Sequence, residues 1–211
     1  RIMGNAIELG LKGTHYHDRI LGSQSPAFQS KMNNGQLVGG DINNRVILYV
    51  SSMMEVKSSM GVIVAAPTAG SCGALPGALF GIAHSLELSE EVLVRAMLSA
   101  GLIGVFIASQ ATFAAEVGGC MAETGSGGGM AAAAIVEMKG GTLDQSIAAA
   151  SMALQNSLGI ICDPIGNRVE APCLGRNVMA ATNGLSSANM ALANYEKLIP
   201  LDEVIQTMKL V

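Results

Sequence analysis

The chain has 211 residues, enough for one large domain or two small ones, and a formal net charge of −4. Half of the residues are hydrophobic but only 3% are aromatic, so small and unbranched side chains must build the core. The acidic balance and the lack of a basic run argue against a nucleic-acid partner. Charged residues make up 13% of the chain, against about 25% in an ordinary soluble domain, which predicts burial against another subunit and hence an oligomer.

The N-terminal part is expected to contain one short helix followed by loops. The helix ends at Leu11, and the segment from Ser23 to Gly40 is predicted as loop and turn because it is rich in glycine and asparagine. His15 and His17 lie between these two parts. On an extended chain this pair would share a face and could hold a metal ion, but a solvated turn is the favoured interpretation.

A helix from Ile42 to Met60, with Asp41 as its N-cap, precedes a first glycine-rich loop. The apolar run Val62–Ala66 has the pattern of a short strand or a helix end, and the loop Pro67–Gly73 leads into another helix. Backbone N–H groups in such a loop, aimed by the helix behind them, can bind an anion. Tight packing of helices is the alternative explanation for these small residues.

The next helix is capped by Ser89 and is predicted to run to about Ala115. Its most apolar window, Val92–Phe113, is long enough to span a bilayer, which takes about 20 residues. Arg95 lies within the window and no positively charged loop flanks it. A buried central helix is therefore favoured, and no membrane is expected.

In a second glycine-rich loop before a helix, Thr124–Gly127 resembles Thr68–Ser71 of the first loop, and Thr182–Ser186 resembles it more weakly. If these similarities are real, three helix N-termini could converge on one small anion. Chance recurrence in a sequence so rich in small residues explains them equally well.

A capping box of Thr142 and Gln145 begins a further helix. Another helix is expected from about Asn177 to Tyr195, with a possible break at Gly184, and a last helix follows Pro200. Strand signal is scarce throughout. The predicted fold class is therefore all-α: a single compact Ala/Gly-rich helical domain that takes up the whole chain.

The four cysteines, Cys72, Cys120, Cys162 and Cys173, include no CxxC pair, so their spacing is not by itself a metal signature. Buried structural thiols are one interpretation. The other is a metal site made by Cys120, Cys162 and Cys173, which stand beside glycine or proline in expected loops next to helix ends. Because the sequence shows no secretory signal, we expect reduced thiols and a cytoplasmic protein.

Three stretches carry a resemblance to a known family: IVAAPTAGSCGALPGAL, EVGGCMAETGSGGGMAAAAIVEM and CDPIGNRVEAPCLGRN. Together they resemble the alpha chain, or catalytic domain, of iron–sulfur-dependent L-serine dehydratase (L-serine ammonia-lyase). The resemblance covers about residues 37 to 192, and residues 1–36 add little to it. It implies a lyase that converts L-serine to pyruvate and ammonia by β-elimination, with a place in amino-acid degradation and gluconeogenesis.

The resemblance also implies a cofactor. A [4Fe–4S] cluster would be held by Cys120, Cys162 and Cys173, with one iron left open as a Lewis acid, whereas Cys72 would not be a ligand. We expect the serine carboxylate at the two glycine-rich loops, with residues Thr68, Ala69, Gly70 and Ser71 first and Thr124, Gly125 and Ser126 second. The candidate bases for the Cα proton are Lys57 and Glu123, each explained equally well as a member of a structural ion pair.

In the resembled family a beta chain or a fused beta domain adds regulatory and substrate contacts, and its serine- and histidine-containing motif is absent from this sequence. We therefore expect such a beta subunit or domain as a partner, and L-serine as the substrate. Two other functions stay open. One is a related cluster-dependent lyase for another small amino acid, such as a cysteine desulfidase, and the other is a non-catalytic helical scaffold subunit.

Overall fold

The computed structural model describes residues 1–211 and is all-α, which confirms the predicted fold class. Its β-type pairing is limited to an isolated bridge between Ile165 and Arg168, and residues 62–66 are irregular rather than a strand. The helices are α1 (Ile2–Leu11), α2 (Ser25–Asn33), α3 (Asp41–Ser58), α4 (Ala74–Ser85), α5 (Glu90–Gln110), α6 (Ala115–Cys120), the π-helix η1 (Met121–Gly125), α7 (Ser126–Met138), α8 (Leu143–Gln155), α9 (Glu170–Leu192) and α10 (Leu201–Leu210).

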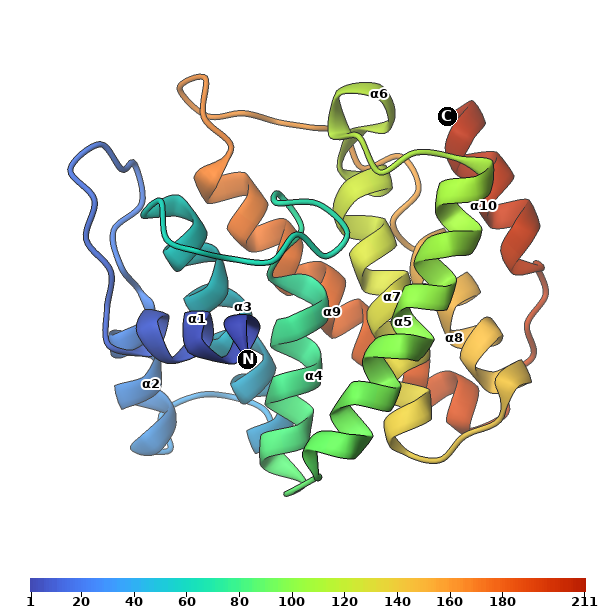
Figure 1. The fold of residues 1–211 in the computed structure, drawn as a ribbon, viewed down its shortest axis with the longest axis horizontal. Coiled ribbons are helices and arrows are strands. Elements are labelled where there is room, and N and C mark those ends of the chain that lie inside the picture. Colours follow the sequence, from blue (N-terminus) through green and yellow to red (C-terminus); the bar gives the residue numbers. More distant parts are fainter.

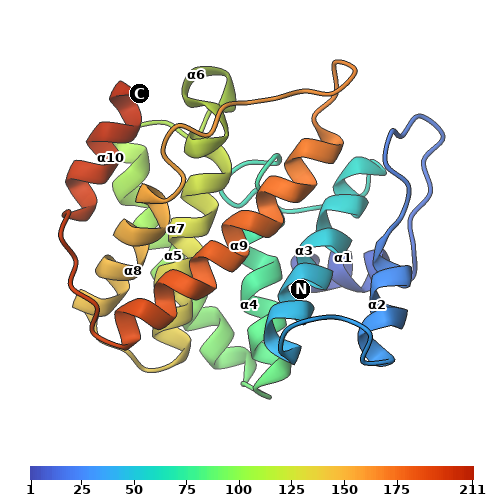
Figure 2. The same cartoon turned by 180° about the vertical axis from the view of Figure 1, so that it is seen from behind.

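Helix α7 lies at the centre of the molecule. All of its residues except Glu137 are buried, and it packs against α4, α5, α8 and α9. Figures 1 and 2 show α1, α2 and α3 on the α4 side of this group and α10 at the opposite edge. The buried alanine, leucine, isoleucine, valine and methionine side chains form one continuous cluster, so the chain is a single compact domain.

The crossing of α7 and α9 depends on glycine. A Cβ atom at Gly184 would lie 2.9 Å from the carbonyl oxygen of Gly128, and one at Gly128 would lie 2.9 Å from the carbonyl oxygen of Ala180. A side chain at either position would push the two helices apart. The predicted break at Gly184 is therefore wrong, because α9 runs through unbroken and Thr182–Ser186 is not a helix N-terminus.

Two predicted caps are confirmed. The hydroxyl of Ser89 accepts a hydrogen bond from the N–H of Val92 at 3.4 Å, at the start of α5. The side chains of Thr142 and Gln145 pair with each other's backbone N–H groups at 3.2 and 2.9 Å, which completes the capping box of α8.

The segment from Ser23 to Gly40 is not all loop, because it contains α2. Glu55, a buried residue of α3, stabilises the start of α2. Its carboxylate accepts hydrogen bonds from the N–H groups of Gln24 at 2.6 Å and Ser25 at 3.1 Å. A carboxylate at a helix N-terminus is stabilising. This helix forms through a contact between segments that are distant in the sequence, which local turn composition cannot reveal.

Three other helix boundaries differ from the prediction. Asp41 is the first residue of α3 rather than its cap, and its carboxylate pairs with Arg45 at 3.0 Å. Helix α5 ends at Gln110, short of Ala115, and a separate short helix follows. Helix α9 begins at Glu170, seven positions before the expected start (177 − 170).

The prediction that the apolar window of residues 92–113 is a buried central helix is wrong. Only 28% of the most apolar window of α5 is buried, and the central position belongs to α7. By length and composition alone, α5 is the one helix that could cross a membrane.

The connecting segments that carry the sequence motifs meet at one end of the helices. Figure 1 shows the segment before α4, the short helix α6 and the segment before α9 together at the upper end of the domain, and Figure 2 shows the same grouping from behind.

Candidate active site

A cavity of about 660 Å³ lies among these connecting segments. Its lining comes from the end of α3, the first glycine-rich loop, the region of α6 and η1, the segment before α9 and the first turn of α9. The lining residues are Lys57, Thr68, Ala69, Gly70, Ala114, Ala115, Glu116, Glu123, Cys162, Val169 and Cys173. Candidates from four separate parts of the sequence therefore share one cavity.

The first glycine-rich loop is held by its own hydroxyl groups. The N–H of Thr68 donates to the Ser71 hydroxyl, and the N–H of Ser71 donates to the Thr68 hydroxyl, both at 3.2 Å. The N–H groups of Ala69 and Gly70, which belong to the cavity wall, have no acceptor within the chain. Two neighbouring N–H groups of this kind can receive a carboxylate.

Glu123 lies against this loop. Its Oε2 accepts a hydrogen bond from the Thr68 hydroxyl at 2.6 Å, and its Oε1 occupies the space that a Cβ atom at Gly70 would need. Lys57, in the last turn of α3, lines the same cavity, and neither residue belongs to an ion pair of the chain. The structural ion-pair interpretation of these two residues is therefore wrong.

Cys120 is the last residue of α6 rather than a loop residue, and η1 follows it directly. The preceding Gly119 has a φ of +64°, and a Cβ atom there would lie 2.8 Å from the carbonyl oxygen of Ile160, so only glycine fits without strain. The N–H of Met121 donates to the same oxygen at 2.9 Å. These contacts attach the Cys120 region to the segment that carries Cys162.

Cys162 is exposed and lies on the extended segment that precedes α9. This segment reverses direction at Gly166 and Asn167, whose φ values are +56° and +59°. Two backbone hydrogen bonds between Ile165 and Arg168, at 2.8 and 3.0 Å, close the reversal, as in a type I′ turn.

The N-terminal part of the chain supports the same segment. The Glu170 carboxylate accepts hydrogen bonds from the N–H groups of Ile20 and Leu21, both at 2.5 Å, and the Arg168 guanidinium donates to the Asp18 carboxylate at 2.7 Å. The N-terminal residues thus hold the turn between Cys162 and Cys173.

Cys173 is buried in the first turns of α9, where its N–H donates to the carbonyl of Val169 at 2.8 Å. Burial raises the pKa of its thiol, the Lys57 ammonium opposes this, and the charges of Glu123 and Cys162 raise it further. Burial also raises the pKa of Cys120 to about 12, with further contributions from Cys162 and Cys173. The three thiols are therefore close enough to influence one another electrostatically.

The cysteine thiols are sulfur donors of the type that iron–sulfur clusters use. No group of three or more histidine, cysteine or acidic side chains is close enough to hold one metal ion. All four cysteines are free thiols. Cys162 and Cys173 line the cavity, and the charges of both influence Cys120. Thiolates are the usual ligands of iron–sulfur clusters. Neighbouring thiolates repel one another, and a cationic centre among them would favour their deprotonated form.

The second glycine-rich stretch is not a loop. Thr124 and Gly125 belong to η1, Ser126 begins α7, and all three are buried away from the cavity. The Thr124 hydroxyl donates instead to the carbonyl of Cys120 at 2.8 Å. The backbone of these residues is helical, so the prediction of a second anion-binding loop is wrong. The placement does not favour substrate contact by these residues.

His15 and His17 are exposed and lie outside the cavity. Their placement agrees with the favoured interpretation of a solvated turn.

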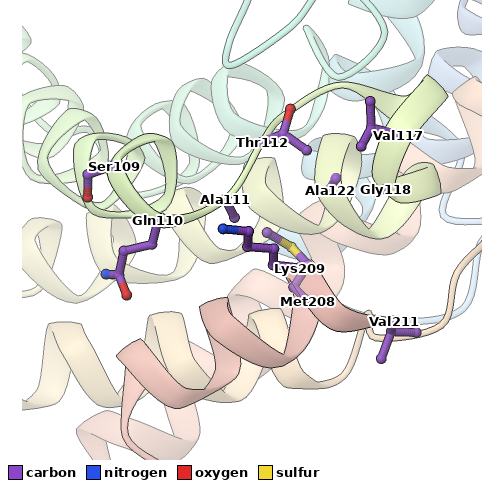
Figure 3. Close-up of a pocket in the computed structure, with 10 residues that line it drawn as sticks. All are labelled: Ser109, Gln110, Ala111, Thr112, Val117, Gly118, Ala122, Met208, Lys209 and Val211. Carbon is purple, nitrogen blue, oxygen red and sulfur yellow. The ribbon is translucent and has the colours of Figure 1, made fainter.

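A second cavity, of about 340 Å³, lies on the other side of α6 and is drawn in Figure 3. It lies between the end of α5, the segment before α6 and the C-terminal helix α10, and it contains Thr112, Val117, Met208 and Lys209. No cysteine lines it. The thiol-lined cavity is therefore the better candidate for a reaction site.

Two polar residues near the thiol-lined cavity were not anticipated. Glu116 lines the cavity wall, and Asn177 hydrogen-bonds the first glycine-rich loop from α9. Asn177 ends the stretch CDPIGNRVEAPCLGRN, but nothing in a single sequence distinguishes it from an ordinary helical asparagine. Glu116 lies in α6, just after Ala115, where the sequence predicted the end of the preceding helix.

The fold and the cavity define an all-α catalytic domain whose reactive groups are contributed by the ends of several helices. The chain belongs to the serine dehydratase alpha chain family, whose sequence model matches residues 1–211.

Several curated proteins are similar to this chain. The probable L-serine dehydratase alpha chain of Bacillus subtilis (strain 168) is 41% identical over 207 residues, which cover 98% of this chain and 69% of the relative. The probable L-serine dehydratase alpha chain of Latilactobacillus sakei is 48% identical over 169 residues, which cover 80% of this chain and 81% of the relative. The L-serine dehydratase alpha chain of Peptoniphilus asaccharolyticus is 44% identical over 176 residues, which cover 83% of this chain and 60% of the relative.

Proposed function

We propose that this chain is the cluster-bearing catalytic part of an L-serine dehydratase, which converts L-serine to pyruvate and ammonia. One observation carries the proposal. In a chain of this family, a cavity brings together two free backbone N–H groups, an amine, a carboxylate and cysteine thiols. These are the groups that β-elimination from a small hydroxy amino acid requires: a carboxylate receiver, a base and a site for an electrophile.

We assign the electrophile to a [4Fe–4S] cluster held by Cys120, Cys162 and Cys173. When bound, such a cluster with one iron free of protein ligands supplies a Lewis acid that weakens the bond between serine Cβ and its hydroxyl oxygen. The free thiols of Cys162 and Cys173 in the cavity wall, and their charge influence on Cys120, support this assignment. Cys72 is left out because its fully buried sulfur donates to the sulfur of Met54 at 3.7 Å.

The chain's own residues bind and orient the substrate. In this proposal the N–H groups of Ala69 and Gly70 receive the serine carboxylate, and the Thr68 and Ser71 hydroxyls keep the loop in shape. A base takes the Cα proton, and the electron pair of that C–H bond forms the Cα–Cβ double bond. The Cβ–oxygen bond breaks with its electron pair on oxygen, so that hydroxide leaves and takes up a proton to become water. The resulting aminoacrylate takes up water to give pyruvate and ammonia.

Lys57 and Glu123 are the candidate bases. Glu123 already accepts the Thr68 hydroxyl, which fixes its carboxylate beside the loop. Lys57 is held in the cavity wall without an ion-pair partner in the chain. Both groups are near the position where the loop would hold serine, so single substitutions that remove the proton acceptor of each decide between them.

We further propose a beta subunit or fused beta domain as the partner, because the matched relatives are named alpha chains. The low share of charged residues, 13%, supports burial of this surface in an oligomer. Four free thiols support a reducing compartment such as the cytoplasm.

Anaerobic reconstitution tests the proposal. Iron and sulfide are quantified, and pyruvate release from L-serine is measured with and without the beta partner. We expect visible thiolate-to-iron absorbance and serine-dependent pyruvate. Sulfide release from cysteine without ammonia release from serine would identify a cysteine desulfidase. Absence of the absorbance, with all four thiols still titratable, would indicate a scaffold subunit.

A further inference from the structure

One amide side chain joins the two halves of the cavity. Asn177 is fully buried in α9, one turn after Cys173. Its Oδ1 accepts hydrogen bonds from the N–H groups of Gly73 at 3.1 Å and Ala74 at 2.9 Å. Its Nδ2 donates to the carbonyl oxygens of Gly70 and Cys173, both at 2.8 Å. The amide therefore uses both donor hydrogens and two acceptor positions.

Each half of this amide acts on a different part of the site. The oxygen caps the N-terminus of α4, which fixes the end of the glycine-rich loop. The nitrogen connects the Gly70 carbonyl, in the middle of that loop, to the carbonyl of Cys173. The Gly70 carbonyl shares its peptide group with the N–H of Ser71, so the bond from Asn177 fixes the backbone directly after the free N–H groups of Ala69 and Gly70.

We propose that Asn177 is a positioning residue that holds the substrate loop at a set distance from Cys173. It does not line the cavity, so it acts through Gly70 and Cys173 rather than by touching a substrate. This inference deepens the proposed function, and its effect on the KM for L-serine rests on that function. Its effect on the order of the loop is expected in the metal-free protein as well.

Asparagine is required here because both a donor and an acceptor are needed. In Asn177→Asp, the carboxylate would still accept from Gly73 and Ala74, and negative charge at the start of α4 is favourable. It could no longer donate, so an oxygen would face the carbonyl oxygens of Gly70 and Cys173. This substitution therefore separates the coupling of the loop to Cys173 from the capping of α4.

The first test uses metal-free protein. Hydrogen exchange followed by mass spectrometry should show about tenfold faster exchange in peptides covering residues 68–74 of Asn177→Asp. The matched control is Asn183→Asp in the same helix, which loses a bond to the carbonyl of Ala153, at 2.8 Å, on the side of α8. The control should leave exchange in residues 68–74 unchanged. Equal exchange in wild type and Asn177→Asp would overturn the inference.

The second test is kinetic and uses reconstituted enzyme with its beta partner. We expect the KM for L-serine to rise about tenfold in Asn177→Asp while kcat changes by less than about threefold, because carboxylate binding is weakened throughout the reaction. A protein that is merely destabilised would lose active molecules, which lowers kcat at an unchanged KM. That result would assign Asn177 a structural role only and would overturn the inference.

Two results keep the inference separate from the proposed function. If wild-type enzyme releases no pyruvate, the proposed function is wrong, and the hydrogen-exchange comparison alone judges the coupling. If Asn177→Asp does not fold by circular dichroism, Asn177→Ser replaces it in both tests. A helical serine commonly bonds the carbonyl four residues before it, so it would keep Cys173 paired and release Gly70 together with the N–H groups of Gly73 and Ala74.

Discussion

The four cysteine residues differ in what surrounds their sulfur atoms. Cys72 is fully buried, its S–H points at Met54, and burial raises its pKa to about 12. Cys162 is exposed on an extended segment. Reactivity follows the thiolate form and its accessibility, so these two residues should behave very differently toward an electrophile.

Alkylation of the metal-free protein checks this difference. At about pH 8 a thiol whose pKa is near 12 stays protonated, so Cys72 should resist iodoacetamide while Cys162 reacts first. In urea the pKa of Cys72 returns to about 8.5 and the residue should react freely. Mass spectrometry of the digested protein measures both rates. Equal modification of Cys72 in native and unfolded protein would contradict the burial of its sulfur.

Serine substitutions test the ligand assignment. Cys120→Ser, Cys162→Ser and Cys173→Ser should each abolish the bound cluster, whereas Cys72→Ser should retain it. The physical reason is that Cys162 and Cys173 line the cavity and influence Cys120 through their charges, whereas the sulfur of Cys72 contacts Met54. Iron and sulfide content after anaerobic reconstitution gives the result. A cluster that needs Cys72 but tolerates loss of one of the other three would show the assignment to be wrong.

Two isosteric substitutions test the candidate bases. Glu123→Gln keeps an acceptor for the Thr68 hydroxyl but cannot take a proton, and Lys57→Met keeps the length of the side chain without its amine. Loss of the true base should lower kcat by about 10²- to 10⁴-fold, and the other substitution should cost much less. Steady-state pyruvate release is the measurement. If both variants keep wild-type kcat, neither residue is the base.

At the scale of the elements, glycine decides how closely the helices of this domain pack. Where two helices cross at Gly128 and Gly184, the backbones themselves are in contact. In contrast, Gly101 of α5 is exposed, and a Cβ atom added there would have no heavy atom within 4 Å. Glycine in a helix interior is unfavourable by itself, so only the first pair is explained by packing within the chain.

Alanine substitution separates the two situations. Gly184→Ala should lower the free energy of unfolding by about 1–3 kcal/mol, because the added methyl group meets the Gly128 carbonyl. Gly101→Ala is the matched control and should raise it by about 0.5–1 kcal/mol. Urea denaturation followed by circular dichroism gives both values. A neutral Gly184→Ala would mean that α7 and α9 do not cross in backbone contact.

At the scale of the whole molecule, α5 leaves an apolar face in contact with solvent. Leu98 is 70% exposed and Val105 is 61% exposed, and Val94 and Leu102 are each about half exposed on the same face. Exposed apolar area of this kind favours association. The low charge of the chain gives little electrostatic repulsion to oppose it.

The chain by itself should therefore associate as its concentration rises. A Leu98→Gln, Leu102→Gln double variant should shift light scattering toward the monomer without lowering the melting temperature, because both side chains are at least half exposed. Two exposed substitutions on another surface, Val38→Gln and Val62→Gln, serve as the control. If the control changes association as much as the α5 variant does, the α5 face is not responsible.

The sequence by itself determined the helical class, the composition of the core and the capping signals of α5 and α8. These properties depend on neighbouring residues: scarce strand patterns, small apolar side chains, and Ser89 or Thr142 placed before a helix. The three motif stretches also identified the family, and the family model matches the whole chain. Lys57 and Glu123 are polar residues near those motifs, and Thr68 belongs to the glycine-rich loop within the first of them.

Tertiary contacts decided what local patterns could not. The Glu55 carboxylate of α3 holds the start of α2 inside a stretch that has loop composition. Thr124–Ser126 is helical although its glycine and serine content is typical of a loop. Asn177 links Gly70 to Cys173 across more than a hundred residues of sequence, 107 positions from Gly70. Such partners are set by the packing of the helices, so only the folded chain shows which polar groups meet at the cavity.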